Sequence, residues 1–218
     1  MRRLADGLHR WTARHPEWHP GEFGAQVACY AAAVDGGTLL IDPLVLCDDD
    51  AERLDGVVAG KVSILITIPY HVRSAEQLAA RYRGRIHGHA AVASRLRSTA
   101  RFSPVEPGAR LPGGATAHTI GNPRRQEMPY HLPSHGALAF GDAVVEAGGA
   151  LRVWVEPPVD SAGRRRWYRE RLVPSLRPLL DLNAGRVLAT HGEPVLRGGR
   201  AALARALDDG AWSRPRAG

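Results

Sequence analysis

The pattern of apolar and polar residues along the chain predicts strands first. Residues 26–34 are mostly small and apolar, and Asp35-Gly36-Gly37 separates them from the apolar residues 38–42. A glycine-rich turn between two such segments is typical of a β-hairpin. Further on, residues 61–68 read KVSILITI, a β-branched run that is typical of a strand buried on both faces. We therefore expect two antiparallel strands followed by a buried one.

The next segments indicate helices that alternate with strands. Ser74, followed three residues later by Gln77, reads as a capping box, which predicts a helix from Ser74 to about residue 82. Residues 85–88 read as a short strand and residues 89–96 as a second helix. This alternation favours a layered α/β fold.

The middle of the chain, residues 102–155, has a different pattern. Short β-like pieces are separated by turns that contain Gly, Pro or Asn, as in an antiparallel meander. The predicted pieces are residues 115–120, 128–132, 137–140 and 151–155. Residues 164–182 then carry leucines at helical spacing, interrupted by Pro174 and Pro178, which we expect to kink the helix. A strand at 185–190 and a helix at 201–207 complete the predicted elements.

The composition says more about the class of protein than about its fold. Hydrophobic residues make up 44% and charged residues 23% of the 218 residues, as in a globular protein with a real core. No apolar run approaches the roughly 20 residues of a membrane helix. The charged N-terminus lacks the apolar stretch of a secretory signal, and two cysteines make no disulfide framework. We expect one cytoplasmic domain, with an N-terminal arm at residues 1–23, a sandwich at 24–207 and a tail at 208–218.

The net charge of +7 raises the possibility of a nucleic-acid partner, because a basic face attracts phosphate. All but one of the 29 Lys and Arg residues are arginine, and they are scattered along the chain. Aromatic residues are not interleaved with them, as stacking on single strands would require. We therefore expect neither a nucleic-acid nor a membrane partner.

Three motifs lie at the ends of predicted strands, and their order along the chain is informative. They are Leu40-Ile41-Asp42, Gly141-Asp142 and His191-Gly192. In this order the chain resembles the metallo-β-lactamase superfamily over about residues 26–207. The resemblance implies an α/β fold, a four-layer αββα sandwich. It also implies that Asp142 and His191 occupy metal-ligand positions and that Asp42 supports the site from behind.

The first metal motif of that superfamily, Thr-His-x-His-x-Asp-His, is replaced in this chain. When Thr67 is matched to the threonine of this motif, the resemblance places other residues at the ligand positions of the motif. These are Ile68, Tyr70, Val72 and Arg73, with Asn122 at the position of a further histidine. None is a usual zinc ligand, and two surviving ligands are fewer than the three that a catalytic zinc takes from protein. We therefore expect a dismantled dinuclear site with no bound metal.

The charge of the former metals needs a replacement, because Asp142 would otherwise be a carboxylate without a counter-charge in a cleft. Arg73 stands at a former ligand position and carries a guanidinium that matches a carboxylate. We expect an ion pair between Arg73 and Asp142, with Tyr70 and His191 hydrogen-bonded nearby. His71 joins them if its turn swings inward, and these five residues are the candidate catalytic groups.

Two other segments carry candidates with simpler alternatives. Asn122, Arg124 and Arg125 lie where the superfamily has a loop at the edge of the site, so they are candidate substrate-binding residues for an anion. The two arginines could equally be solvated. Trp11 and Trp18 in the N-terminal arm are expected to pack on the core, with a lid over the cleft as the alternative.

The remaining histidines leave a metal alternative open. His71, Asp142 and His191 form a candidate single-metal set, for one zinc or a similar divalent ion. The pairs His87 with His89 and His131 with His135 are expected to be hydrogen-bonded or surface residues.

Three functions follow from these observations. The first is a small-molecule-binding or small-molecule-transforming cleft without zinc, in which acid–base groups do any chemistry. The second is a metal-dependent hydrolase of the metallo-β-lactamase superfamily with a rearranged single-metal site that includes Asp142 and His191. The third is a non-enzymatic interaction module. The sequence favours the first, and it indicates neither the ligand nor the oligomeric state.

Overall fold

Seven strands form the larger sheet of the protein, which a computed structural model describes at residues 1–18, 23–121, 125–155 and 162–212. They pair in chain order, antiparallel from β1 to β4 and parallel from β4 to β7. The strands are β1 (Arg2–Ala5), β2 (Leu8–Arg14), β3 (Gln26–Val34), β4 (Gly37–Ile41), β5 (Lys61–Ile66), β6 (Arg85–Gly88) and β7 (Phe102–Pro104). The predicted hairpin and buried strand are confirmed as β3, β4 and β5.

Two smaller sheets follow, where a single meander was expected. In the first, β10 pairs antiparallel with β9 and parallel with β13. Its strands are β8 (Thr116–Ala117), β9 (Tyr130–Leu132), β10 (Ala137–Ala139) and β13 (Arg186–Leu188). The other sheet contains β11 (Val144–Ala147), β12 (Ala150–Trp154) and β14 (Ala211–Trp212).

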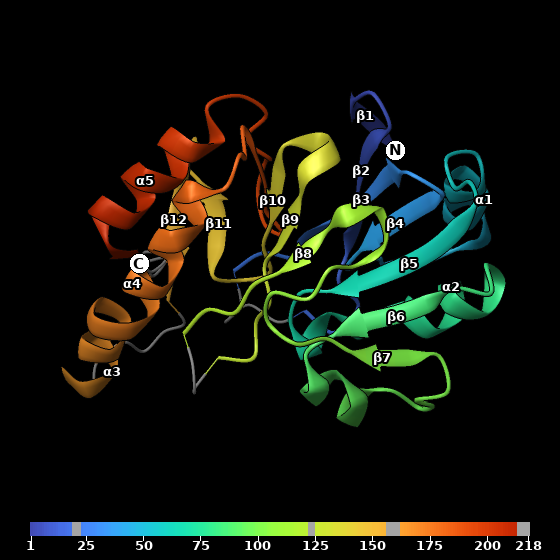
Figure 1. Cartoon of the computed structure of the whole chain (residues 1–218), viewed down its shortest axis with the longest axis horizontal. Helices are drawn as coiled ribbons and strands as arrows, with labels where there is room; N and C mark the ends of the chain where they lie inside the picture. Colours follow the sequence, from blue (N-terminus) through green and yellow to red (C-terminus); the bar gives the residue numbers. More distant parts are fainter. Residues whose placement is uncertain (19–22, 122–124, 156–161, 213–218) are drawn as a thin grey trace.

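Helices cover the outer faces of the sheets (Figure 1). The α-helices are α1 (Asp48–Asp55), α2 (Ala75–Arg81), α3 (Ala162–Trp167), α4 (Val173–Leu176) and α5 (Gly199–Asp209). The short 3₁₀ turns are η1 (Pro69–Val72), η2 (Ala90–Arg95), η3 (Pro112–Gly114), η4 (Pro133–His135) and η6 (Arg177–Asp181), and η5 (Tyr168–Leu172) is a π-helical turn. Residues 162–181 stay helical without a gap, which confirms the predicted helical region, and only the type of helix changes along it. Pro174 and Pro178 stand in the first turn of the last two segments.

Three separate apolar cores fill the spaces between four layers. Side chains alternate across β3 and β5, so that Cys29, Ile64 and Ile66 face α1 and α2 while Tyr30 and Leu65 face the smaller sheets. A third core lies between the smaller sheets and α3, α4 and α5, seen at the left of Figure 1. This sequence of helices, sheet, sheets and helices confirms the predicted αββα sandwich.

The ends of the chain differ from the prediction. Residues 1–23 were expected to form an arm, but β1 and β2 extend the large sheet, with β2 paired to β3 along its whole length. Trp11 does pack in the core, as expected, and its Nε1 donates to the carbonyl of Leu44. The predicted tail also takes part in the fold, because β14 pairs with β12.

The capping box predicted at the start of α2 is wrong. The hydroxyl of Ser74 donates to the carbonyl of Val45 and accepts from the Val45 amide, so it makes no cap for the helix. Ser74 therefore ties the loop before α1 to the loop before α2, beside the ends of β4 and β5. No described helix is long and apolar enough to cross a membrane.

Candidate functional site

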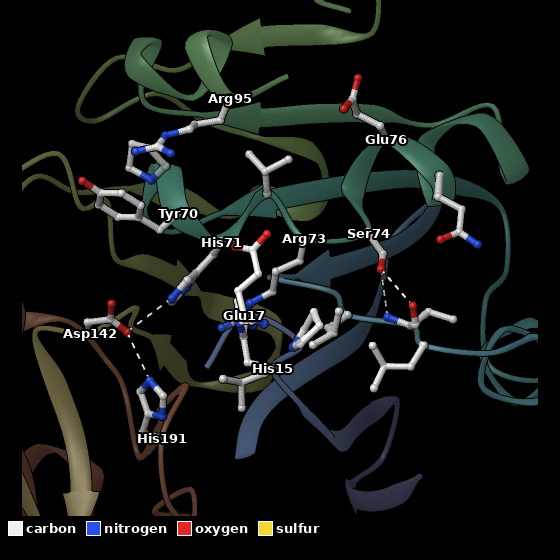
Figure 2. Close-up of a pocket in the computed structure, with 18 of the residues that line it drawn as sticks. His15, Glu17, Tyr70, His71, Arg73, Ser74, Glu76, Arg95, Asp142 and His191 are labelled. Atoms are coloured by element: carbon white, nitrogen blue, oxygen red, sulfur yellow. Dashed lines mark hydrogen bonds and ion pairs between the residues drawn. The ribbon is translucent and has the colours of Figure 1, made fainter. Parts of the chain in front are cut away.

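The strand ends that carry the three sequence motifs meet at one edge of the two central layers. Asp42 follows β4 and His71 lies in η1 after β5, so both belong to the large sheet. Asp142 follows β10 and His191 follows β13, in the facing sheet. Figure 2 shows His71, Asp142 and His191 pointing toward one another at the floor of a cleft.

Asp42 is the buried anchor of this group. Its backbone takes a left-handed conformation, φ 46°, and its side chain is almost fully buried. The carboxylate accepts hydrogen bonds from the Thr67 amide at 2.8 Å, from the Thr67 hydroxyl, and from Nδ1 of His71 at 2.8 Å. Asp42 therefore fixes both the end of β5 and the orientation of the His71 ring.

His71 bridges two carboxylates. While Nδ1 contacts Asp42, Nε2 lies 3.3 Å from Oδ1 of Asp142, and only 5% of the residue is exposed. Burial and the charge of Arg73 lower the pKa of His71, but Asp142 and Asp42 outweigh them and raise it to about 9. His71 is therefore an imidazolium at neutral pH, held between two anions.

Asp142 receives positive charge from two histidines. Its Oδ1 lies 3.3 Å from Nε2 of His71 and 3.5 Å from Nε2 of His191. Burial alone would raise the pKa of Asp142, but His71 and His191 hold it well below its usual range. Oδ1 itself is inaccessible to solvent, while the Asp142 side chain as a whole is 18% exposed, so the carboxylate meets the cleft through its other atoms.

The predicted ion pair between Arg73 and Asp142 is wrong. The Arg73 guanidinium donates to the backbone carbonyl of Asp42 at 2.9 Å and lies 3.9 Å from Sγ of Cys29. Its backbone is left-handed, φ 43°, at the end of η1. The turn brings His71 to Asp142 instead, so the counter-charge comes from the residue two positions earlier.

The other former ligand positions have structural uses. Val72 packs in the core beneath α2, and Ile68 is buried. Tyr70 points outward, 67% exposed, with the Arg95 guanidinium 4.5 Å from its ring centre. Tyr70 is thus directed toward solvent, next to Arg95 (Figure 2).

These residues do not fit the dinuclear centre that the superfamily resemblance implies. Ile68 and Val72 have no donor atom, Tyr70 is directed away, and Arg73 brings a fixed positive charge. Within the described ranges, no three His, Cys, Asp or Glu side chains are arranged to hold a metal ion. The chemistry available at the cleft floor is proton donation and acceptance by His71, Asp142 and His191.

Arg125, a candidate substrate-binding residue, is engaged elsewhere. Its guanidinium pairs with the fully buried Glu127, with Nη2 and Oε2 2.7 Å apart, and only 14% of its side chain is exposed. Arg125 therefore binds Glu127 in this structure and does not face the cleft as a free substrate-binding group. Asn122 and Arg124, the other two candidates, lie outside the described residues.

Glu127 is a site residue that sequence reasoning missed. Its carboxylate accepts from the amides of Gly141 and Ala143, on either side of Asp142. Burial raises the pKa of Glu127, an effect that the Arg125 charge opposes. A side chain at Gly141 would put its Cβ 2.7 Å from the Thr67 hydroxyl and 3.2 Å from the Glu127 carboxyl carbon. The available signal was a Glu beside an Arg just before an apolar strand, which reads more readily as a solvated pair.

The cleft above these groups has a volume of about 1080 Å³. Its lining includes the labelled residues of Figure 2, together with Phe23, Leu46, Arg97 and Trp154. The ring of Phe23 stacks 5.0 Å from that of His191. The other histidines considered from sequence are not among the lining residues: His135 contacts the carbonyl of Ala33, and His89 accepts from the Ala91 amide.

Comparison with known proteins identifies the architecture. No protein-family model and no curated protein matches the sequence. Among solved structures, a metallo-β-lactamase family protein from Thermus thermophilus is 18% identical with a TM-score of 0.63, over 95% of this chain and 80% of that one. A metallo-β-lactamase superfamily protein from Sulfolobus tokodaii is 16% identical with a TM-score of 0.64, over 93% and 85%. A metallo-β-lactamase from Erythrobacter litoralis is 15% identical with a TM-score of 0.64, over 95% and 93%.

Agreement over 93–95% of this chain and 80–93% of the others, at identities this low, is an agreement of fold. The chain has the metallo-β-lactamase fold.

Proposed function

We propose that the protein binds, and with its acid–base groups transforms, a small molecule in the cleft without bound zinc. The observation that carries this proposal is the position of His71. Its ring contacts Asp42 at 2.8 Å on one side and Asp142 at 3.3 Å on the other. A positively charged ring therefore stands against the carboxylate that a metal would otherwise neutralise.

The cleft has the properties of a small-molecule site. It combines a polar floor with apolar side chains on its walls, and its volume suits a ligand of drug-like size. At the floor, Nε2 of His71 and Nε2 of His191 flank Oδ1 of Asp142. The exposed part of the Asp142 side chain faces the cleft, so a bound ligand would exchange a proton with this group there, which is the acid–base role proposed here.

Binding in the presence of a chelator tests the proposal. A library of small molecules would be screened by ligand-observed NMR against tag-free protein in EDTA. Gly24 lines the cleft, and a Cβ there would meet nothing within 4 Å, so Gly24→Trp adds a bulky side chain to the cleft lining without a clash at Cβ. Gly185→Trp is the matched control, because Gly185 is equally open and does not line the cleft.

The expected result is one or more ligands that bind the wild type and Gly185→Trp but not Gly24→Trp. Binding that survives in Gly24→Trp, or that requires added zinc, would contradict the proposal.

A further inference from the structure

One wall of the cleft carries arginines that are not neutralised by carboxylates. Arg73, Arg95 and Arg97 all line it, and in the described part of the chain none of them forms an ion pair. Arg73 is half-buried: its Nε is inaccessible to solvent, and its Nη1 donates to the carbonyl of Asp42. The other N–H groups of this guanidinium are the donors left for an anion that is not part of the protein.

The backbone holds Arg73 in this position. A φ of 43° is unfavourable for a residue with a long side chain, and such conformations persist only where the surroundings impose them. The hydrogen bond from Nη1 to the carbonyl of Asp42 fixes the guanidinium at the cleft wall. Arg73 is therefore preorganised and needs no rearrangement to receive a ligand.

A second guanidinium is held at the rim. Arg95 lies over the ring of Tyr70 at 4.5 Å, an arrangement that orders an otherwise mobile side chain. Two acidic groups of the cleft are already occupied: Asp142 faces two histidines, and Glu76 accepts from the amides of Arg97 and Ser98. Glu17 is the remaining described carboxylate in the lining, and it lies at the exposed rim.

The same cleft presents apolar surface to solvent. Three large hydrophobic residues are exposed in the described ranges, and two of them, Leu46 at 51% and Tyr70 at 67%, line this cleft. Phe23 and Trp154 add an edge-to-face ring pair to the lining. Exposed apolar groups gathered at one concave site indicate a ligand with an apolar part.

We propose that the cleft takes a small organic anion, a carboxylate or a phosphate monoester with an apolar body. The anionic group binds Arg73, Arg95 adds positive charge to the same cleft, and the apolar body covers Leu46 and Tyr70. This inference rests on the proposed small-molecule function and names its ligand class. Guanidinium groups recognise carboxylate and phosphate by the same paired donors, so both anions belong to the class.

Four small probes test the inference by NMR titration and calorimetry: benzoate, phenyl phosphate, the neutral benzyl alcohol, and inorganic phosphate. At least one aromatic anion should bind about tenfold or more tightly than benzyl alcohol and than inorganic phosphate. Whichever of benzoate and phenyl phosphate binds more tightly identifies the anionic group.

Variants locate the anion. Arg95→Gln, at the exposed rim, should weaken binding about fivefold and leave the fold unchanged, while Arg200→Gln on α5 serves as the control and should have no effect. Arg73→Gln should abolish binding, and Arg73→Lys should retain part of it. If Arg73→Gln fails to fold, the binding affinities of Arg95→Gln and Arg73→Lys still test whether the arginines bind the anion.

Equal binding of benzyl alcohol and the anions, or anion binding unaffected by Arg95→Gln and Arg73→Lys, would overturn the inference. So would the failure of both aromatic anions to bind. Neutral ligands that bind the wild type in EDTA and not Gly24→Trp would leave the proposed small-molecule function standing while the anion inference fell.

Discussion

Three successive residues in η1 face three different environments, and this decides the chemistry of the site. Tyr70 faces solvent, His71 faces Asp142, and Val72 faces the core beneath α2. Matching the sequence to the superfamily motif assigns roles by position along the chain. It does not reveal the direction of each side chain, because a tight turn rotates consecutive side chains by about a third of a revolution. The histidine one residue away from the motif positions is the one that points inward.

The stability of the protein should depend on pH through His71. Its pKa is raised from 6.5 to about 9 in the folded state, so folding favours the protonated ring. This contribution, about 3 kcal/mol, is fully present below pH 6.5 and is lost as the pH rises to about 9. The free energy of unfolding, measured by urea denaturation at a series of pH values, should fall across this window.

His71→Asn provides the control for that titration. The variant should be less stable at pH 6.5 and should show little change in its free energy of unfolding up to pH 9. Burial raises the pKa of the Cys29 thiol from 9.0 to about 11, so its effect begins above this window. Parallel curves for wild type and His71→Asn between pH 6.5 and 9 would mean that His71 does not bridge two carboxylates.

Asp42→Asn should destabilise the protein without disturbing its backbone. Asn tolerates the left-handed conformation that Asp42 adopts, so the variant removes only the anionic acceptor. The Thr67 amide and the His71 ring would then lose a buried charged partner, at a cost of about 3 kcal/mol. Urea denaturation at pH 7 measures the change.

Asp55→Asn is the matched control, because Asp55 pairs with Arg81 at an exposed position. Little or no change in stability is expected there. Equal effects of the two substitutions would show that the hydrogen bonds of Asp42 are not important to the fold.

At the scale of elements, the sequence predicts the central strands well and the connecting segments poorly. β3, β5 and the helical region 162–181 were predicted because their apolar patterns are long and their turn residues are distinctive. β1 was missed because none of its residues is buried, and β2 because its buried Leu8, Trp11 and Ala13 are interleaved with arginines and a buried Arg10, which obscures the apolar alternation. The segment before β9 was missed because a buried Glu127 depends on Arg125 and on two amides from another strand end, which no local pattern reveals.

Glu127 connects the segment before β9 to the turn that follows β10, and Glu127→Gln should break that connection. The amide group would place donors against the amides of Gly141 and Ala143 or against Arg125, and it would leave a buried guanidinium without its anion. The expected loss is about 3 kcal/mol by urea denaturation.

A double-mutant cycle with Arg125→Gln separates the energy of the Arg125–Glu127 ion pair from that of the other contacts of Glu127. The double variant should lose less stability than the sum of the two single variants, because each single change leaves an unpaired buried charge. Additive losses would show that Arg125 and Glu127 act independently.

At the scale of the whole molecule, the site belongs to neither half of the sandwich alone. Asp42 and His71 come from the end of the large sheet, and Asp142 and His191 from the end of the facing one. The contacts of His71 with both carboxylates therefore connect the two central layers at their common edge.

Metal content of the purified protein is the sharpest test of whether His71 replaces metal at Asp142. The protein would be produced without a histidine tag, dialysed without chelator, and analysed by inductively coupled plasma mass spectrometry beside His191→Ala. We predict far less than one transition metal ion per chain in both samples, with the cooperative unfolding of the wild type unchanged by EDTA. One or more metal ions per chain in the wild type, lost in His191→Ala, would contradict the replacement.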